Sequence, residues 1–67
     1  MIRNDNELTV TQERIAYFQG LLARLRVTAR PEEFPLVSKG YAAEIERMQT
    51  DVLRYLTRHA VEMAEAV

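Results

Sequence analysis

Residues 41–67 read YAAEIERMQTDVLRYLTRHAVEMAEAV, and their apolar spacing decides the expected fold. The positions of one stripe recur every three or four residues, which places their side chains on one face of an α-helix. The stripe consists of Tyr41, Ile45, Met48, Val52, Leu56, His59, Met63 and Val67. At about 1.5 Å of rise per residue it would extend roughly 39 Å. The pattern therefore predicts one long helix over residues 36–66.

A shorter stripe precedes this segment. Its members have the same spacing but extend only about 15 Å, which predicts a first helix over residues 11–27. They are Ile15, Phe18, Leu22 and Leu25. Thr9 with Gln12 has the form of a capping box, and Thr11 offers an alternative helix start. Residues 1–10 alternate weakly between polar and apolar side chains, so we expect an extended arm there.

Two prolines separate the predicted helices. Pro31 disfavours helical backbone angles at the residue before it, and Pro35 repeats the restriction four residues later. A connection of this length is typical of two antiparallel helices, so we expect the chain to reverse over residues 28–35. The predicted fold class is all-α: an antiparallel helical hairpin with a short helix, a proline turn and a long helix, forming one domain over residues 1–67.

The size of the chain predicts self-association. The chain has 67 residues and contains no cysteine, so no disulfide can stabilise it. A domain this small buries only about 60% of the surface that its unfolded chain exposes. Because the second stripe is much longer than the first, a lone hairpin would also leave apolar surface uncovered. We therefore expect a homo-oligomeric four-helix bundle, as a dimer or a higher assembly, with the dimer favoured.

The two stripes supply the expected interface. Its side chains are Ile15, Phe18, Leu22, Leu25, Tyr41, Ile45, Met48, Val52, Leu56, His59 and Met63. The central core is expected from the four positions of the first helix with Ile45, Met48, Val52 and Leu56. Met63 and Val67 are expected in the projecting end of the long helix.

Motifs for chemistry are scarce in this sequence. His59 is the one histidine, and it lies on the apolar stripe, where interface packing is a simpler explanation than catalysis or metal binding. We therefore expect no enzyme activity, no metal and no cofactor. The first residues contain no apolar run long enough for a secretory signal, and no later stretch approaches the roughly 20 apolar residues of a membrane span. We therefore expect a cytoplasmic protein.

The charge balance argues against nucleic acid as a partner. Nine basic and ten acidic residues give a formal net charge of −1, whereas binding to phosphates usually requires a basic excess. The candidate basic residues are Arg14, Arg24, Arg26 and Arg54. Arg24 and Arg26 fall near the end of the first predicted helix, where cations interact favourably with the helix dipole.

The order of several residues resembles a known family. These are Met1-Ile2-Arg3-Asn4-Asp5, Thr9-x-Thr11, Phe18, Leu22, the proline turn, Glu44-Ile45 and Tyr55. Together they resemble the amino-terminal helical segment that precedes the helix-turn-helix domain in some bacterial antitoxin-like regulators of the Xre/Cro type. The resemblance covers residues 1–56 and implies a dimerising hairpin associated with such regulators or with toxin neutralisation. Nothing in the sequence matches their DNA-reading domain, so DNA binding is not implied.

Two functions follow from these patterns. The favoured one is a non-enzymatic oligomerisation or protein-interaction module, of an antitoxin-like or regulator-associated kind, whose partner is a second copy of itself or a second protein. The alternative is a small RNA-binding regulator, because plasmid-type helical hairpins that dimerise into four-helix bundles and bind paired RNA are similar in size and layout.

Replacing Val52 with aspartate tests the expected assembly. We expect Val52→Asp to dissociate the oligomer and unfold the chain together, since a lone buried charge costs several kcal/mol against a stability of the same order. Circular dichroism and analytical ultracentrifugation on the same sample would measure both effects. A mutant that is folded and monomeric would contradict the expectation.

Overall fold

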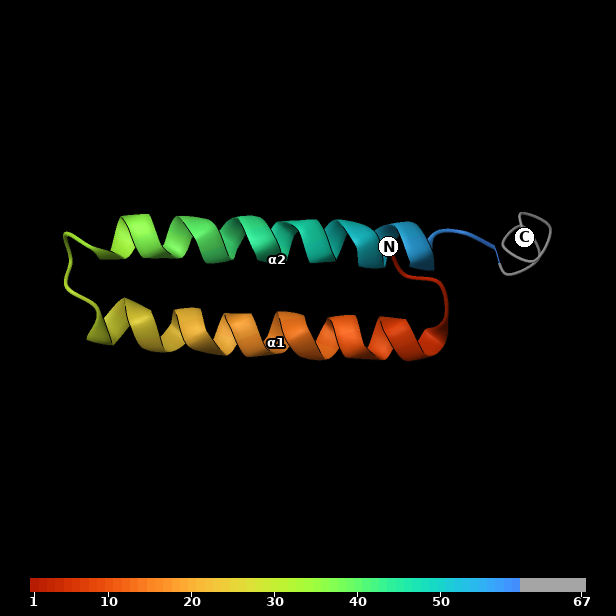
Figure 1. The fold of residues 1–67 in the computed structure, drawn as a ribbon, viewed down its shortest axis with the longest axis horizontal. Coiled ribbons are helices and arrows are strands. Elements are labelled where there is room, and N and C mark those ends of the chain that lie inside the picture. The colour runs from red at the N-terminus through yellow and green to blue at the C-terminus, as the bar shows by residue number, and fades with distance from the viewer. Residues whose placement is uncertain (60–67) are drawn as a thin grey trace.

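Two antiparallel helices of nearly equal length lie side by side in the computed structural model, which describes residues 1–59 (Figure 1). Helix α1 spans Asp5–Thr28 with 24 residues, and helix α2 spans Phe34–Leu56 with 23 residues. The residues before α1 cross back toward the carboxyl end of α2. The expected all-α hairpin is confirmed, but the lengths show no mismatch between the helices over the described part of the chain.

Helix α1 begins six residues earlier than predicted, so the expected extended arm over residues 5–10 was wrong. Asn4 is the cap: its side-chain oxygen accepts a hydrogen bond from the Glu7 backbone N–H at 2.8 Å. The Glu7 carboxylate in turn accepts from the Arg3 backbone N–H at 2.7 Å. The hydroxyls of Thr9 and Thr11 donate to backbone carbonyls four residues earlier, as threonines inside a helix do. The cap signal at Asn4 and Glu7 therefore prevails over the two threonine signals.

The reversal falls where the prolines predict it. Helix α1 ends at Thr28, and the next residue, Ala29, has an extended backbone but still donates its N–H to the Leu25 carbonyl at 2.9 Å. The backbone N–H groups of Glu33 and Phe34 both donate to the Arg30 carbonyl at 3.0 Å, which closes the turn. Pro35 then lies in the first turn of α2, where its missing N–H would have no helical partner in any case.

Helix α2 begins at Phe34 and ends at Leu56, so the prediction of a continuous helix over residues 36–66 was wrong at residues 57–59. The Thr57 hydroxyl donates to the Leu53 carbonyl at 2.7 Å, and the Arg58 N–H donates to the Tyr55 carbonyl at 3.4 Å. These contacts use the last carbonyls of the helix in a tightened final turn. The predicted positions Met63 and Val67 lie outside the described residues.

The core of this hairpin is small. Within residues 1–59 the buried apolar side chains are Ile2, Ile45 and Met48, with exposed fractions of 8%, 7% and 3%. Most of the other predicted core positions are half-buried: Ile15, Phe18, Leu22, Leu25 and Val52. Leu56, predicted as core, is 57% exposed and lies in the last turn of α2. Ile2 was not predicted, since its segment was expected to be a free arm.

The amino-terminal cap offers a direct test of the α1 start. We expect Asn4→Ala to lower the free energy of unfolding by about 1 kcal/mol, because the Glu7 N–H loses its acceptor. Urea unfolding at one fixed protein concentration would measure the change. Asn6→Ala is the matched control, since it removes the same side chain two residues later inside the helix. Equal stabilities of the two variants would show that Asn4 does not cap α1.

Candidate interaction surface

The seam between the helices accounts for most of the predicted interface residues. Eight of them are half-buried or buried there: Ile15, Phe18, Leu22, Leu25, Tyr41, Ile45, Met48 and Val52. They pack within one chain, so they are not a separate surplus surface of a longer helix. Leu56 and His59 are exposed at the end of the hairpin opposite the turn, where α1 begins and α2 ends. Met63 lies outside the described residues.

Three aromatic rings line up across the seam on one face of the hairpin. The ring centroids of Tyr17 and Phe18 are 5.7 Å apart with an interplanar angle of 66°, which is an edge-to-face arrangement. Phe18 of α1 also lies 5.7 Å from Tyr41 of α2, tilted by 40°. Aromatic pairs at such distances stabilise packing beyond the area that they bury. This cluster fixes how α1 and α2 lie against each other near the turn.

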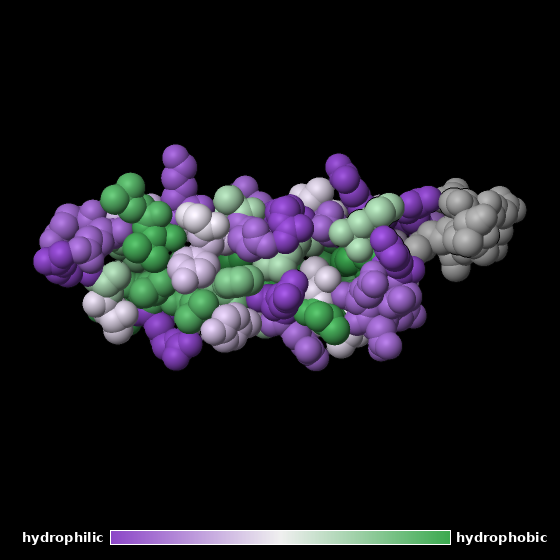
Figure 2. Space-filling view, in the orientation of Figure 1, coloured by the Kyte–Doolittle hydropathy of each residue, from purple (hydrophilic) through white to green (hydrophobic). Residues whose placement is uncertain are grey.

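A hollow adjoins the cluster and is almost entirely apolar. It is lined by Phe18, Val37, Gly40, Tyr41 and Glu44. An added Cβ at Gly40 would meet nothing within 4 Å, so the glycine leaves the hollow open on the α2 side. In Figure 2 most of the green apolar surface lies in the half of the molecule that contains the turn, next to the purple surface of the turn itself. On the face drawn in Figure 2, apolar surface is therefore more extensive near the turn than near the chain ends.

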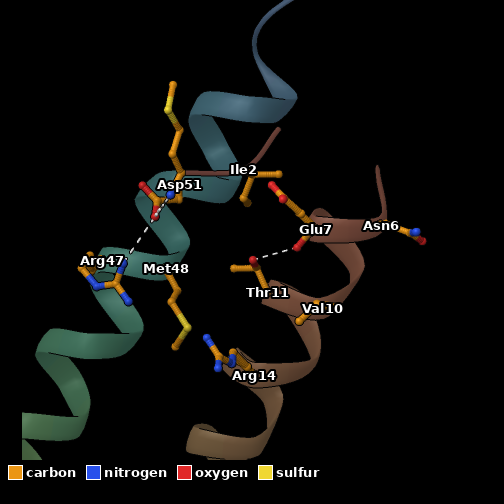
Figure 3. A pocket seen from close by; sticks show the side chains of 10 residues that line it. Ile2, Asn6, Glu7, Val10, Thr11, Arg14, Arg47, Met48 and Asp51 are labelled. Carbon is orange, nitrogen blue, oxygen red and sulfur yellow. Dashed lines mark hydrogen bonds and ion pairs between the residues drawn. The ribbon is translucent and has the colours of Figure 1, made fainter. Parts of the chain in front are cut away.

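Charged groups border the same face toward the other end. The hollow in Figure 3 is lined by Met1, Ile2, Asn6, Glu7, Val10, Thr11, Arg14, Arg47, Met48 and Asp51. Arg47 forms ion pairs with Glu44 and, at 3.6 Å, with Asp51. The Met1 ammonium lies 3.8 Å from the same Asp51 carboxylate. The pKa of Glu44 is lowered, chiefly because the Arg47 guanidinium donates a hydrogen bond to it and also because of the positive charges of Arg47 and Arg14.

A tyrosine and an aspartate join the helices at the open end. The Tyr55 hydroxyl donates a 2.6 Å hydrogen bond to Oδ1 of Asp5, in the first turn of α1. The pKa of Tyr55 is raised because this hydrogen bond is lost on ionisation, with smaller contributions from desolvation and from the Asp5 charge. Ile2 is buried near this contact. It lines two hollows, and Tyr55 lines one of them as well. Residues 1–5 therefore close the open end of the hairpin.

The predicted arginines lie apart from one another. Arg14 and Arg24 are ten positions apart on α1, which separates them by about 15 Å along the helix. Arg26 lies in the last turn of α1, and Arg54 lines a different hollow, beside Met1 and Asp51. Arg47, the arginine that faces Arg14 across the seam, is matched by two carboxylates. The arrangement does not concentrate positive charge.

Residues 1–59 offer neither a metal-binding cluster nor a membrane-spanning helix. No cluster of three or more histidine, cysteine or acidic side chains there is arranged to hold a metal ion. In the same range, neither helix combines the length and the hydropathy that crossing a bilayer requires. His59 is exposed just after the last turn of α2. Within the described chain, the apolar surface next to the aromatic cluster is therefore the candidate interaction surface.

Sequence reasoning missed the exposed members of this surface. Tyr17 is 62% exposed, Val10 is 53% exposed and Val37 is 40% exposed. The signal was available: Val10, Arg14, Tyr17 and Leu21 follow one another at helical spacing directly beside the predicted stripe. A pattern on one helix cannot show which flank the second helix leaves open.

Comparisons with family models, with characterised proteins and with solved structures give no match to this chain. The resemblance to the helical segment of Xre/Cro-type regulators therefore stays a prediction that rests on the residues of the sequence.

The pKa of Tyr55 provides a test of the contact with Asp5. We expect Asp5→Asn to lower this pKa toward the ordinary tyrosine value of about 10, because a neutral acceptor opposes ionisation less. With a raised folded pKa, the stabilisation is complete below the ordinary value and is lost as the pH rises through the folded value. Nuclear magnetic resonance titration of the tyrosine Cζ signals would follow the change.

Glu13→Gln is the control for this titration, since it removes one carboxylate from an exposed position elsewhere on α1. It should leave the Tyr55 pKa where it is in the unmodified chain. An unchanged Tyr55 pKa in Asp5→Asn would show that the hydrogen bond does not persist in solution.

Proposed function

We propose that this chain is a non-enzymatic self-association and protein-interaction module, acting in the cytoplasm as a homodimer whose two hairpins pack into a four-helix bundle. One observation carries the proposal: the described hairpin buries only Ile2, Ile45 and Met48. No large side chain among residues 1–59 is completely enclosed. A core of this size offers little free energy against the conformational entropy of ordering two helices.

The residues that remain partly open support the same proposal. Aromatic and aliphatic side chains of the seam, such as Phe18, Leu22 and Val52, are only half-buried, because each helix has a single neighbour. Packing a second hairpin against the seam would complete their burial, at roughly 25 cal/mol for each Å² of apolar surface removed from water. In a four-helix bundle each helix gains a second neighbour, and seam positions become core positions.

The wider role that we propose follows the resemblance noted above. A dimerising hairpin of this kind would serve as the association part of an antitoxin-like or regulator-associated system. The structure favours a protein partner over RNA, because the candidate arginines are dispersed or matched by carboxylates and the net charge is −1. RNA binding is therefore not proposed as a second function.

Self-association makes the stability depend on protein concentration. We expect the midpoint of thermal unfolding to rise by several degrees between micromolar and hundred-micromolar protein, because mass action favours the folded dimer over unfolded chains. Sedimentation equilibrium over the same range should give the mass of two chains at the upper end. A single chain mass throughout, with a midpoint that does not change, would refute the proposal.

A further inference from the structure

Two rows of side chains border the seam on the same side of the hairpin. On α1 the row is Val10, Arg14, Tyr17 and Leu21; on α2 it is Val37, Gly40, Glu44, Arg47 and Asp51. Their common side follows from the hollows, since Val10 and Arg14 line one hollow together with Arg47 and Asp51. The other hollow brings Val37, Gly40 and Glu44 to Phe18. We call this side the hollowed face.

We propose that the hollowed face is the surface on which the second copy of the chain docks, with its aromatic half at the centre of the contact. This inference rests on the proposed self-association and names the face that performs it. Tyr17 is 62% exposed while its ring lies 5.7 Å from the Phe18 ring in an edge-to-face arrangement, so a large and rigid side chain stands partly out of the surface. Side chains of this kind are enriched at the centres of protein interfaces.

The charges on the hollowed face favour a copy of the same chain as the partner. Arg14 and Arg47 are matched by Glu44 and Asp51, so the four charges sum to zero. A two-fold axis brings the same surface of both chains together, and a surface with equal numbers of both signs can then be complementary to itself. A nucleic acid or a strongly charged protein would require an excess of one sign.

The position of the apolar area supports the same partner. The almost purely apolar hollow lies next to the aromatic cluster. Glu44 lines this hollow and pairs with Arg47, which also pairs with Asp51 one turn further along α2. A second hairpin on this face would therefore bury Tyr17, Val37 and the open sides of Phe18 and Tyr41, while the charged groups would form a polar border. This arrangement of an apolar centre and a polar rim is the usual anatomy of a specific interface.

Leu53 provides a matched control for Tyr17. Both side chains are 62% exposed, and both lie inside a helix. Leu53 follows Asp51 by two positions, which turns it about 200° around α2 and away from the hollowed face. Glutamate at either position introduces the same charge, and the change in helix propensity is only a few tenths of a kcal/mol in both. A difference between the two variants therefore reports on the face and not on the substitution.

The experiment compares Tyr17→Glu and Leu53→Glu with the unmodified chain by sedimentation equilibrium, with circular dichroism as the check on folding. We expect Tyr17→Glu to weaken the dimer at least about tenfold, because a charge enters the centre of the contact, and Leu53→Glu to stay within about twofold of the unmodified chain. Val37→Glu, on the α2 side of the same face, should behave like Tyr17→Glu. If Tyr17→Glu does not fold, Val37→Glu serves as the test in its place.

The outcomes separate this inference from the proposed function. A dimeric unmodified chain that Tyr17→Glu and Val37→Glu leave intact would overturn the assignment of the face and leave self-association standing. The same holds for a dimer that Leu53→Glu weakens as much as Tyr17→Glu does. An unmodified chain that is monomeric at every concentration would refute the proposed function itself.

Discussion

Each helix of a single hairpin has one neighbour, and this constraint governs the rest of the structure. A side chain in the seam is covered by the facing helix but stays open toward the two sides of the pair. This explains why Phe18, Leu22 and Val52 are half-buried although they lie at the centre of the apolar stripes. Met48, which is 3% exposed, lies near the end where the amino-terminal segment covers the seam as a third element.

The fold class and the reversal could be predicted from the sequence because their signals are local and strong. Pro31 and Pro35 restrict the backbone directly, and the spacing of Ile45, Met48 and Val52 defines a helical face. The start of α1 was missed because several cap patterns compete at this end of the chain, and only Asn4 with Glu7 has a complete set of partners. The end of α2 was missed because Leu56, His59 and Met63 continue the apolar spacing past Thr57, where the backbone leaves the helix.

The candidate surface was harder to predict than the fold. Helical spacing identifies the side of a helix that is apolar, but the exposure of Tyr17 and Val37 depends on the angle at which the second helix approaches. The feature that favours self-association differs between the sequence and the structure. The sequence suggested that the first helix is too short to cover the apolar stripe of a longer second helix. In the structure the two helices have nearly equal lengths, and only Ile2, Ile45 and Met48 are buried among residues 1–59.

The contact between Tyr55 and Asp5 joins residues 50 positions apart, whereas the turn joins α1 to α2 within a few residues. Closing a long loop costs more entropy than closing a short one, so contacts beside the turn form before those at the far end. We therefore expect one chain to fold from the turn toward the open end, with the segment around Ile2 docking last. By the same reasoning, we expect local opening to begin at that segment and to reach the aromatic cluster later.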